Sequence, residues 1–481
     1  MSKREKKEIQ IKSTERMKIH GEVLTASREI ESMLDMVNSE FYTPDKTFLE
    51  PACGDGNFLT AILERKLKKA KSEENFVNAL KSLHGIDLLN DNIKLARKRL
   101  SELWIKHYKT VLKKEPEKNI INKINNVLKT NIIQGNFLEC NNYNKSDIDV
   151  IIGNPPYQIV DGGGTGDSAK PIYQYFVRKA KKLSPCYISF IIPSRWMKGG
   201  KGLSDFRREM INDTGIKIIY DFENGQTCFP DLHIDGGVCY FLWSKNYNGK
   251  TEYHHYSLDG TERVTKRFLK NKYTETVIRD YRQESIIKKA CKKKEEKFSS
   301  IVLSRNPFGF YANLFNSPER YPEIKVFYSA SNGLYKIYGV KGKKGNSKRI
   351  FGYIYPSAVT KNKSSAISYK LFFSKAYTST STVPPEIILA KPNEVCTETF
   401  LQIGKFSDKS EAENCLSYIE TRFFRALLFF NRHSLNISKK SFELIPIQDF
   451  SEKWTDEKLY TKYGLEQTEI DYINSVIRPM K

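Results

Sequence analysis

The sequence predicts an α/β fold on a doubly wound parallel sheet, followed by a smaller domain of mixed α+β character. Two observations predict this arrangement. From residue 47 to about residue 192, short apolar runs alternate with amphipathic helical segments, as in parallel sheets with crossover helices. Beyond about residue 257 the alternation stops, and short aromatic-rich strands separated by Gly, Asn and Pro follow. Ligands of a doubly wound sheet bind outside the carboxyl ends of its strands.

The expected elements of the sheet domain follow one another in a simple order. Residues 1–20 are charged and predict a loose arm or a short helix, and residues 27–37 predict a helix with Ser27 as its N-cap. A lysine- and asparagine-rich insertion covers 108–130, and a glycine-rich loop lies at 162–164. We expect strands at 47–50, 82–86, 131–134, 149–152 and 186–192, and helices at 58–71, 90–107 and 172–182.

The second half of the chain predicts a connector and a separate domain. Residues 261–297 are polar and basic and predict a connector that ends in a helix, and 411–430 predict one long helix. The predicted organisation is an arm at 1–20, an α/β domain at 21–256, a basic helical connector at 257–297 and a second domain at 298–481.

Composition restricts the class of protein. The chain has 481 residues, of which 39% are hydrophobic and 12% aromatic, which is typical of a globular protein with two or three domains. No apolar run is long enough to span a bilayer, and no apolar core follows the charged first residues, so we expect neither membrane association nor a secretory signal. The eight cysteines include no CxxC pair, which predicts free thiols in the cytoplasm and no metal site.

The most informative motif directly follows the predicted strand at 149–152. Asn154-Pro155-Pro156-Tyr157 supplies what methylation of a planar amino nitrogen requires. The Asn154 side-chain oxygen and the Pro155 main-chain oxygen can each accept one N–H, which localises the lone pair of the nitrogen for attack. The prolines hold the carbonyl rigidly, and Tyr157 offers a flat face for stacking. Taken by itself, the tetrapeptide also fits a plain Pro-Pro turn.

A second motif, Glu50-Pro51-Ala52-Cys53-Gly54-Asp55-Gly56, lies between a predicted strand and helix, where glycine lets a backbone approach a ligand closely. No Lys-Ser/Thr pair follows, so a nucleoside triphosphate loop is disfavoured, and the acidic residue favours a cationic ligand such as S-adenosylmethionine. Asp87, at the end of the next strand, is placed to accept the ribose hydroxyls. Asn136 could contact the adenine edge and Phe137 its face; an ordinary turn residue is an equal alternative for Asn136.

Together these motifs resemble the γ-class DNA adenine-N6 methyltransferases of restriction-modification type, over roughly residues 20–245. Tyr173-Gln174-Tyr175-Phe176 and Ile191-Ile192-Pro193-Ser194-Arg195-Trp196 resemble segments that follow the catalytic motif in that family. The sequence departs from the family at two positions. Ala26 stands after Thr25, where the family commonly has a proline, and Asn136 stands where the family usually has Asp. The resemblance implies a cofactor, S-adenosylmethionine, bound by Thr25, Glu50, Ala52, Cys53, Gly54, Gly56, Asp87, Asn136, Phe137 and Phe176.

The resemblance also implies how the substrate is held. Asn154, Pro155, Pro156 and Tyr157 would be catalytic, and Phe229 would stack on the flipped base opposite Tyr157. A core Phe at a turn is the alternative for Phe229. A base inside a duplex cannot reach such a pocket, so the target adenine must be swung out at a cost of a few kcal/mol. The loop at 162–166 could close over it.

Charge points to a polyanionic partner. Lys and Arg number 79 against 56 Asp and Glu, for a formal charge of +23. Residues 324–385 include 11 Lys and Arg and no acidic residue. With the resemblance, this predicts a DNA target-recognition domain at 298–481 and double-stranded DNA as the partner. The phosphate-contact candidates are Lys341, Lys343, Lys344, Lys348 and Arg349.

The sequence thus predicts a site-specific DNA adenine-N6 methyltransferase, cytoplasmic and nucleoid-associated, that needs no metal. It would be the modification component of a restriction-modification or related defence system, and a cognate restriction endonuclease encoded separately fits that role; no oligomeric state is assigned. The alternatives are an RNA adenine or protein glutamine N-methyltransferase and a bifunctional restriction-methylation enzyme. The about 220 residues after the catalytic part disfavour the glutamine enzyme, and the short segment before it disfavours a fused N-terminal nuclease.

Overall fold

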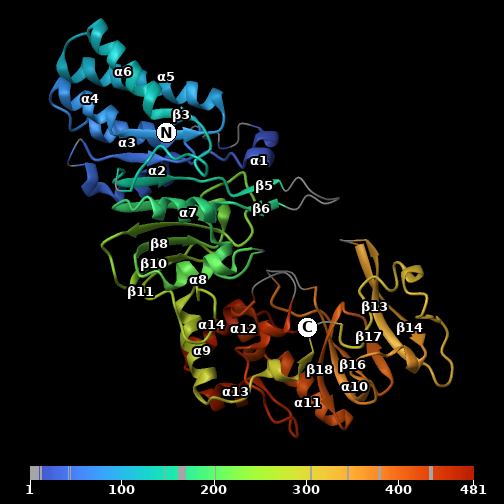
Figure 1. Cartoon of the computed structure of the whole chain (residues 1–481). Helices are drawn as coiled ribbons and strands as arrows, with labels where there is room; N and C mark the ends of the chain where they lie inside the picture. Colours follow the sequence, from blue (N-terminus) through green and yellow to red (C-terminus); the bar gives the residue numbers. More distant parts are fainter. Residues whose placement is uncertain are drawn as a thin grey trace, which may run out of the picture. The chain divides into compact units, whose positions relative to one another are not determined.

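The computed structural model describes residues 10, 13–41, 43, 45–145, 147–160, 169–200, 202–303, 306–343, 346–376, 381–432 and 437–480. The chain divides into two compact units, Met1–Lys270 and Asn271–Lys481, and each is described by itself (Figure 1). The loop predicted at 162–166 and Lys344 lie outside the described residues.

Unit 1 is built on one large sheet with strand order β11-β10-β8-β9-β7-β4-β1-β2-β3. Strand β1 pairs in parallel with β2 on one side and with β4 on the other, and the parallel pairing continues to β3 and β7. The strand order therefore reverses at β1, which places a crevice at the carboxyl ends of β1 and β4. Strand β9 runs antiparallel between β7 and β8. The strands are β1 (Phe48–Glu50), β2 (Leu83–Asp87), β3 (Ile132–Gln134), β4 (Val150–Gly153), β7 (Tyr187–Pro193), β8 (Ile216–Phe222), β9 (Val238–Ser244), β10 (Thr251–Tyr256) and β11 (Glu262–Arg267).

The helices of unit 1 pack their apolar faces on this sheet and on one another (blue to green in Figure 1). A small antiparallel pair, β5 (Gln158–Val160) and β6 (Ala169–Pro171), follows the Asn-Pro-Pro-Tyr motif. The parallel sheet with its crossover helices confirms the predicted doubly wound α/β fold. The helices are α1 (Thr14–His20), α2 (Ser27–Asp35), α3 (Asn57–Leu67), α4 (Glu73–Lys81), α5 (Asn90–Leu112), α6 (Lys118–Asn131), α7 (Tyr173–Lys182) and α8 (Ser204–Asn212).

Unit 1 contains elements beyond the expected ones, such as α4, α8 and β8 to β10, and it departs from three specific expectations. Ala26, not Ser27, is the N-cap of α2, and it makes no side-chain cap bond. The insertion at 108–130 is mostly helical, because Ile124 and Leu128 of α6 recur one turn apart and are buried. Part of the expected connector forms β11, an edge strand of the sheet whose residues alternate between exposed and half-buried.

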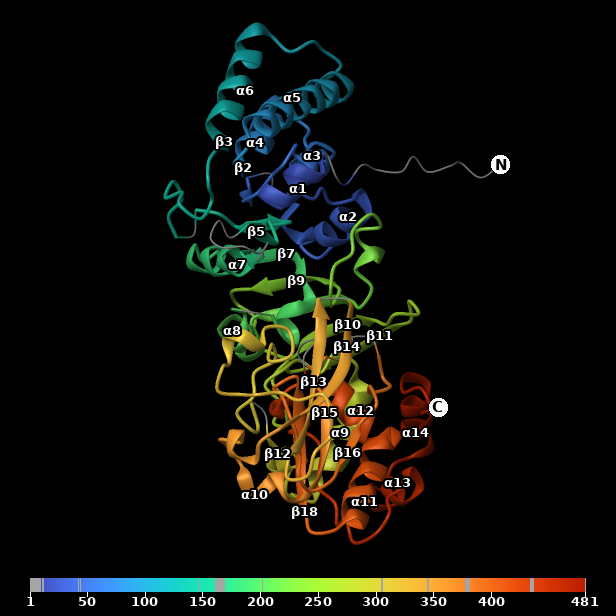
Figure 2. The ribbon, with the colours of Figure 1, turned by 90° about the vertical axis from the view of Figure 1, so that its right-hand side faces the viewer.

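Unit 2 combines two sheets with a group of helices, as the predicted mixed α+β character requires (yellow to red in Figures 1 and 2). One sheet has the order β12-β18-β15-β16 and the other β14-β13-β17. Strands β13 and β14 form a long antiparallel ribbon, which is labelled in both views. The strands are β12 (Val302–Leu303), β13 (Tyr335–Lys343), β14 (Asn346–Ile354), β15 (Tyr369–Ser374), β16 (Ile388–Ala390), β17 (Glu394–Cys396) and β18 (Phe400–Phe406).

The single helix expected at 411–430 is two helices. Thr421 has extended backbone angles, φ −59° and ψ 148°, and its hydroxyl accepts a hydrogen bond from the Phe424 amide as an N-cap. The helices of unit 2 are α9 (Tyr281–Lys292), α10 (Lys363–Ala366), α11 (Lys409–Glu420), α12 (Arg422–Phe430), α13 (Asp456–Tyr463) and α14 (Gln467–Val476). Within the described ranges, no helix combines the length and the apolar character that crossing a bilayer requires.

Candidate active site

Two pockets of unit 1 meet at the Asn-Pro-Pro-Tyr motif. The first, named here the switch-point pocket, lies at the carboxyl ends of β1, β2 and β4 and has a volume of about 720 Å³ including its open mouth. The second, named the tyrosine pocket, has a volume of about 1220 Å³ on the same basis. Asn154 and Pro156 line the first and Tyr157 lines the second, while Gly21 and Val23 line both. The motif therefore forms the boundary between the two pockets.

The glycine turn after β1 forms one wall of the switch-point pocket. Gly54 and Gly56 have positive φ angles of 50° and 86°. A Cβ on Gly56 would come within 3.1 Å of the Ala96 Cβ, so glycine is needed for α3 to approach α5. The Gly54 amide donates a 2.9 Å hydrogen bond to Asp87 Oδ2, which ties the turn to the end of β2.

Glu50 and Thr25 each present an unpartnered polar atom to the switch-point pocket. Glu50 Oε2 and Thr25 Oγ1 are buried, and neither makes a hydrogen bond within the described part of the chain. Burial raises the pKa of the Glu50 carboxyl well above its ordinary value. A buried carboxylate oxygen and a buried hydroxyl are costly unless a ligand supplies their hydrogen bonds. The pair fits a ligand that brings an ammonium group and hydroxyls into the pocket.

Asp87 connects the pocket to the amino-terminal helix. Its Oδ1 accepts hydrogen bonds from the Leu89 amide at 2.9 Å and from Asn92 Nδ2 at 3.1 Å, and burial raises the pKa of its carboxyl. Asn92 also donates to Glu22 Oε1 at 2.7 Å, and Glu22 pairs with Arg16 of α1. Sequence reasoning missed Glu22 and Asn92, both of which line the pocket; the position of Asn92 in the first turn after Asp87 was the available signal.

An aromatic wall completes the switch-point pocket. The rings of Phe137 and Phe176 are stacked, with centroids 5.5 Å apart, and both line the pocket. Asn136 lies next to this wall but does not line the pocket. Its Oδ1 accepts from the Leu138 amide at 3.0 Å and its Nδ2 donates to Glu139 at 2.8 Å. The structure thus places Asn136 as a turn residue, the second of its two interpretations, and Gly135 takes the pocket position.

Asn154 is held by one end of its amide. Its Nδ2 donates a 3.0 Å hydrogen bond to the main-chain oxygen of Val23, whereas its buried Oδ1 has no partner among the described residues. Gly21, with φ 66°, packs so tightly on the motif that a Cβ would lie 3.1 Å from the Gln158 oxygen and 3.2 Å from the Pro156 Cβ. The segment 21–25 therefore orients the Asn154 amide and leaves its oxygen available as an acceptor.

Two tyrosines, Tyr157 and Tyr173, line the tyrosine pocket. The hydroxyls of Tyr157 and Tyr173 are buried and have no partner in the described ranges, and burial raises the pKa of both. Both phenols therefore stay protonated near neutral pH. The lining residues are Met17, Gly21, Val23, Tyr157, Gln158, Pro171, Tyr173, Pro193, Arg195, Gly200, Leu203, Leu232, His233, Ile234 and Asp235.

Phe229 does not face Tyr157 across this pocket. Its ring meets that of Tyr157 edge-on, at 84° with centroids 6.2 Å apart, and it is fully buried in the core. Its amide donates a hydrogen bond to the Gly225 oxygen in the turn before it. The structure favours the core interpretation of Phe229, and residues 232–235, which follow it, line the pocket instead.

The phosphate-contact candidates of unit 2 differ in their surroundings. Lys341 and Lys348 are exposed and stand directly opposite each other on β13 and β14, and Lys343 opposes Asn346. Arg349 is already engaged: it lies 3.2 Å from the Glu386 carboxylate and donates to the Glu386 main-chain oxygen. Lys370, in the same acid-free stretch, is fully buried and donates to three main-chain oxygens, so the stretch is not all surface.

The fold and the pocket are typical of S-adenosylmethionine-dependent methyltransferases, so S-adenosylmethionine is the expected cofactor. Four features are typical of that class: the strand reversal at β1, the antiparallel β9 between β7 and β8, the glycine turn and the carboxylate at the end of β2. No group of His, Cys, Asp and Glu in the described residues is arranged to hold a metal ion.

Comparisons with known proteins give a narrower family. Residues 81–229, which run from β2 through the Asn-Pro-Pro-Tyr motif, match the Eco57I restriction-modification methylase family. An uncharacterized adenine-specific methylase of Mycoplasma pneumoniae (strain ATCC 29342 / M129 / Subtype 1) is 45% identical over 112 residues, 23% of this chain and 26% of the relative. The chain thus spans about a quarter of the length of that curated relative. The predicted resemblance to adenine-specific restriction-modification methylases is confirmed for this segment.

Solved structures with related folds are more distant. The type IIL restriction-modification enzyme MmeI in complex with DNA is 12% identical, with a TM-score of 0.44 over 83% of this chain and 66% of that one. The type IIG restriction endonuclease BpuSI is 13% identical, with a TM-score of 0.39 over 94% of this chain and 61% of that one. The M protein of the type I restriction enzyme EcoKI is 14% identical, with a TM-score of 0.32 over 44% of this chain and 45% of that one.

Proposed function

We propose that the protein is a site-specific DNA adenine-N6 methyltransferase that transfers a methyl group from S-adenosylmethionine to a flipped adenine. The observation that carries the proposal is the unpartnered, buried Oδ1 of Asn154 at the boundary between the two pockets. An acceptor in this position binds an N–H of an amino group that enters from the tyrosine pocket. The match to an adenine-specific methylase of Mycoplasma pneumoniae supports adenine as the substrate, and the Eco57I-family match supports a restriction-modification methylase.

The chain's own residues would prepare the nitrogen for methyl transfer. Asn154 Oδ1, fixed through the Val23 hydrogen bond, and the Pro155 main-chain oxygen would each accept one N–H. These two acceptors localise the nitrogen lone pair and stabilise the positive charge that develops on nitrogen. No strong base is needed beforehand, because the nitrogen becomes acidic only after transfer. Tyr157, whose ring lines the tyrosine pocket, would stack on the base.

The switch-point pocket would hold the cofactor, which supplies an electrophilic methyl group on its sulfonium. Glu50 and Thr25 would bind its methionine end, since both present unpartnered polar atoms there. Asp87 would accept from the ribose hydroxyls, and Phe137 and Phe176 would pack on the adenine ring. Gly54, Gly56, Ala52 and Cys53 form the turn that lets the ligand approach the backbone.

We further propose that residues 298–481, which make up most of unit 2, are the target-recognition domain and that double-stranded DNA is the partner. The formal charge of +23 and the exposed Lys341 and Lys348 support a phosphate-binding surface. In this role the protein would act with the nucleoid, as the modification component of a restriction-modification system with a separately encoded endonuclease.

Methyl label from S-adenosylmethionine tests the substrate class. The purified protein and the tritiated cofactor are incubated in three separate reactions, with unmethylated genomic DNA, with total RNA and with a protein extract. We expect label in DNA only, with Asn154→Ala as the inactive control. Label in RNA or in protein glutamine, with none in DNA, would replace DNA by the corresponding alternative substrate and overturn the role proposed for unit 2.

A further inference from the structure

A cationic side chain stands at the tyrosine pocket without a function in the proposed chemistry. Arg195 lines this pocket together with Tyr157 and Tyr173, and it is exposed to solvent. Its guanidinium makes no ion pair or hydrogen bond within the described part of the chain. Other arginines of unit 1 are paired; Arg178, for example, bonds to Glu209 through two nitrogens at 2.8 Å.

The neighbouring Tyr173 adds a second donor. Tyr173 lines the pocket and is 2% exposed. Its hydroxyl has no hydrogen-bond partner among the described residues. Burial raises the pKa of this hydroxyl, and the nearby Arg195 charge partly offsets that rise. The buried Tyr173 hydroxyl lacks the partner that a buried donor needs, and the exposed Arg195 supplies a positive charge at the same pocket, so the two side chains together suit an anionic acceptor.

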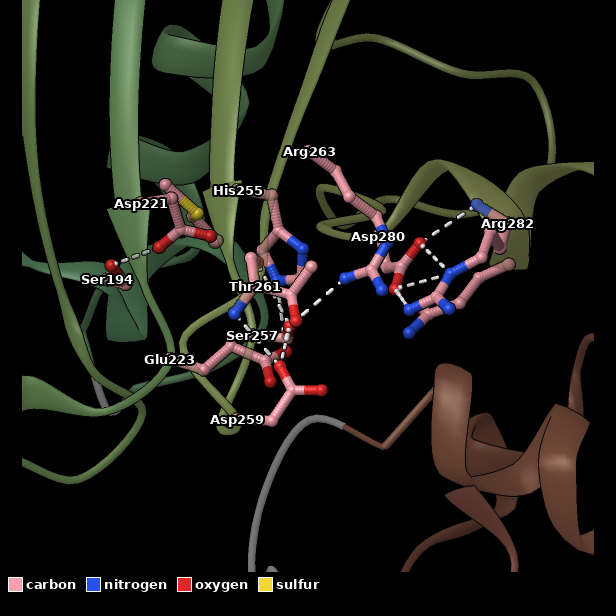
Figure 3. Close-up of polar contacts among 12 residues, drawn as sticks. Ser194, Asp221, Glu223, His255, Ser257, Asp259, Thr261, Arg263, Asp280 and Arg282 are labelled. Carbon is pink, nitrogen blue, oxygen red and sulfur yellow. Dashed lines mark hydrogen bonds and ion pairs between the residues drawn. The ribbon is translucent and has the colours of Figure 1, made fainter. Parts of the chain in front are cut away.

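The turn that carries Arg195 is fixed from two sides. Ser194, which begins the short 3-10 turn Ser194–Met197, donates a 2.7 Å hydrogen bond to Asp221 Oδ1 (Figure 3). Tyr253 of β10 donates to the other oxygen of Asp221, also at 2.7 Å. All three side chains are buried.

Helix α8 holds the same turn on its other side. Arg207 Nη1 donates to the main-chain oxygens of Trp196 at 3.4 Å and Gly199 at 3.2 Å, and the Trp196 ring is fully buried. A backbone held in this way needs no reorganisation when a ligand binds, which is what a preorganised binding group requires.

We propose that Arg195 and Tyr173 bind the DNA phosphate that adjoins the target adenine, and that Ser194, Asp221 and Tyr253 position Arg195 for this contact. The inference rests on the proposed function, because a flipped nucleotide brings its own phosphates to the mouth of the pocket that takes its base. Arg195 matches the two oxygens of a phosphate with parallel N–H groups. The contact retains the extrahelical nucleotide and carries no sequence information.

Steady-state methylation of a duplex that contains the protein's target site tests the contact. Arg195→Gln is expected to lower kcat/KM for DNA by about 10- to 100-fold, the range for one charge-assisted hydrogen-bonding group. Cofactor affinity, measured by calorimetry, should stay within twofold of wild type. Arg195→Lys should recover part of the loss, since it keeps the charge. Arg208→Ala is the matched control, because Arg208 is exposed on α8, lines neither pocket and pairs with the neighbouring Asp205.

A neutral methylphosphonate at each phosphate next to the target adenine identifies the ligand. At one of the two positions the methylphosphonate should lower the kcat/KM of wild type by a similar factor but have no further effect on Arg195→Gln. The effect of this methylphosphonate on the kcat/KM of Tyr173→Phe should lie between its effects on wild type and on Arg195→Gln. If a methylphosphonate at either position lowers the kcat/KM of Arg195→Gln by the same factor as it lowers that of wild type, the phosphate assignment is overturned. A kcat/KM of Arg195→Gln within twofold of wild type would overturn the whole inference, while methylation by wild type leaves the proposed function intact.

Positioning by the buried network is tested with Ser194→Ala. It should lower kcat/KM for DNA with little change in cofactor affinity, and the double variant with Arg195→Gln should be no worse than Arg195→Gln alone. The 2-aminopurine fluorescence of a duplex carrying that base at the target position should fall in parallel, because fewer nucleotides stay flipped. If folded Ser194→Ala, checked by its thermal midpoint, and Tyr253→Phe both keep wild-type kcat/KM and flipping, the positioning role is excluded.

Discussion

At the scale of single residues, Asn154 combines a fixed orientation with a free acceptor. Its amide nitrogen is committed to the Val23 main-chain oxygen, so its oxygen has one direction in which to act. Glu50 presents a similar case in the neighbouring pocket, where its Oε2 is buried and unpartnered. Unsatisfied buried polar atoms are rare in folded proteins, and their concentration around these two pockets points to ligands.

Replacing Asn154 tests its role as acceptor. Asn154→Ala is expected to keep cofactor affinity within a few-fold of wild type and to lower kcat by about 10²- to 10³-fold, the cost of removing one preorganised group of this kind. Isothermal titration of the cofactor and single-turnover methylation measure the two quantities. Ser204→Ala, at the first residue of α8, is a control for substitution as such. Single-turnover rates near wild type for Asn154→Ala would contradict the mechanism.

Glu50 predicts how cofactor binding depends on pH. Its pKa is raised in the folded protein, so the ionised form that attracts a cationic ligand is lost as pH falls through that raised value. S-adenosylmethionine affinity should therefore weaken on acidification, above the pH at which an ordinary glutamate protonates. Glu50→Gln should bind the cofactor more weakly at neutral pH and lose most of this pH dependence. Calorimetry between about pH 5 and 8 measures the pH dependence of cofactor affinity in both proteins. The same pH dependence in Glu50→Gln as in wild type would exclude Glu50 as the titrating group.

The residue-scale predictions from sequence rest on motifs in continuous segments. The structure brings the glycine turn, Asp87 and Asn154 to one crevice because parallel strands end at the same edge of a sheet. The side-chain direction of Asn136 was beyond such reasoning, since it depends on a local competition with Glu139 and Leu138. The contact of Val23 with Asn154 joins positions 131 apart, so no local pattern announces it.

At the scale of elements, the β13–β14 ribbon carries an unusual charge arrangement. Lys341 and Lys348 occupy directly opposed positions on the antiparallel strands, and both are exposed. Like charges in opposed positions destabilise a ribbon unless a counter-charge binds. The base of the ribbon is well anchored, since the Phe315 ring packs where Gly339 and Gly352 leave space for it.

Charge reversal at one of these lysines separates stability from binding. Lys348→Glu should stabilise unit 2 by about 0.2–1 kcal/mol, because it converts a repulsive cross-strand pair into an attractive one. The same change should weaken DNA binding and lower the salt slope of log K by about 1–2. Lys453→Glu is the control, since it makes the same charge change at an exposed position outside the ribbon. Equal effects of both variants on DNA binding would show that the ribbon has no special part in it.

Elements were predictable where the apolar pattern was strong. The βα alternation identified the parallel sheet, and its strands lie within about two residues of the expected bounds. Helix α6 was hidden because several Asn residues lie on its exposed face and lower the apparent helix propensity. The division between α11 and α12 was also hidden, since apolar residues continue across Thr421 while only its backbone departs from the helix.

At the scale of the whole molecule, each unit has its own hydrophobic core and the chain carries a large positive charge. The charge predicts that DNA affinity falls steeply with salt, by about 10³-fold or more between 50 and 200 mM if six or more phosphates are contacted. Cofactor affinity should change far less, because binding a small ligand does not release the counterions that surround a row of DNA phosphates. Fluorescence anisotropy with labelled DNA measures the first quantity and calorimetry the second. DNA affinity that is independent of salt would contradict a phosphate-dominated interface.

The central claim is transfer of a methyl group to the N6 nitrogen of adenine in DNA. The most direct test is to incubate the protein with isotopically labelled S-adenosylmethionine and unmethylated genomic DNA, digest the DNA to nucleosides and identify the labelled one by chromatography and mass spectrometry. We predict label in N6-methyldeoxyadenosine from wild type and none from Asn154→Ala. Label in a methylated cytosine, or equal label from both proteins, would contradict the account.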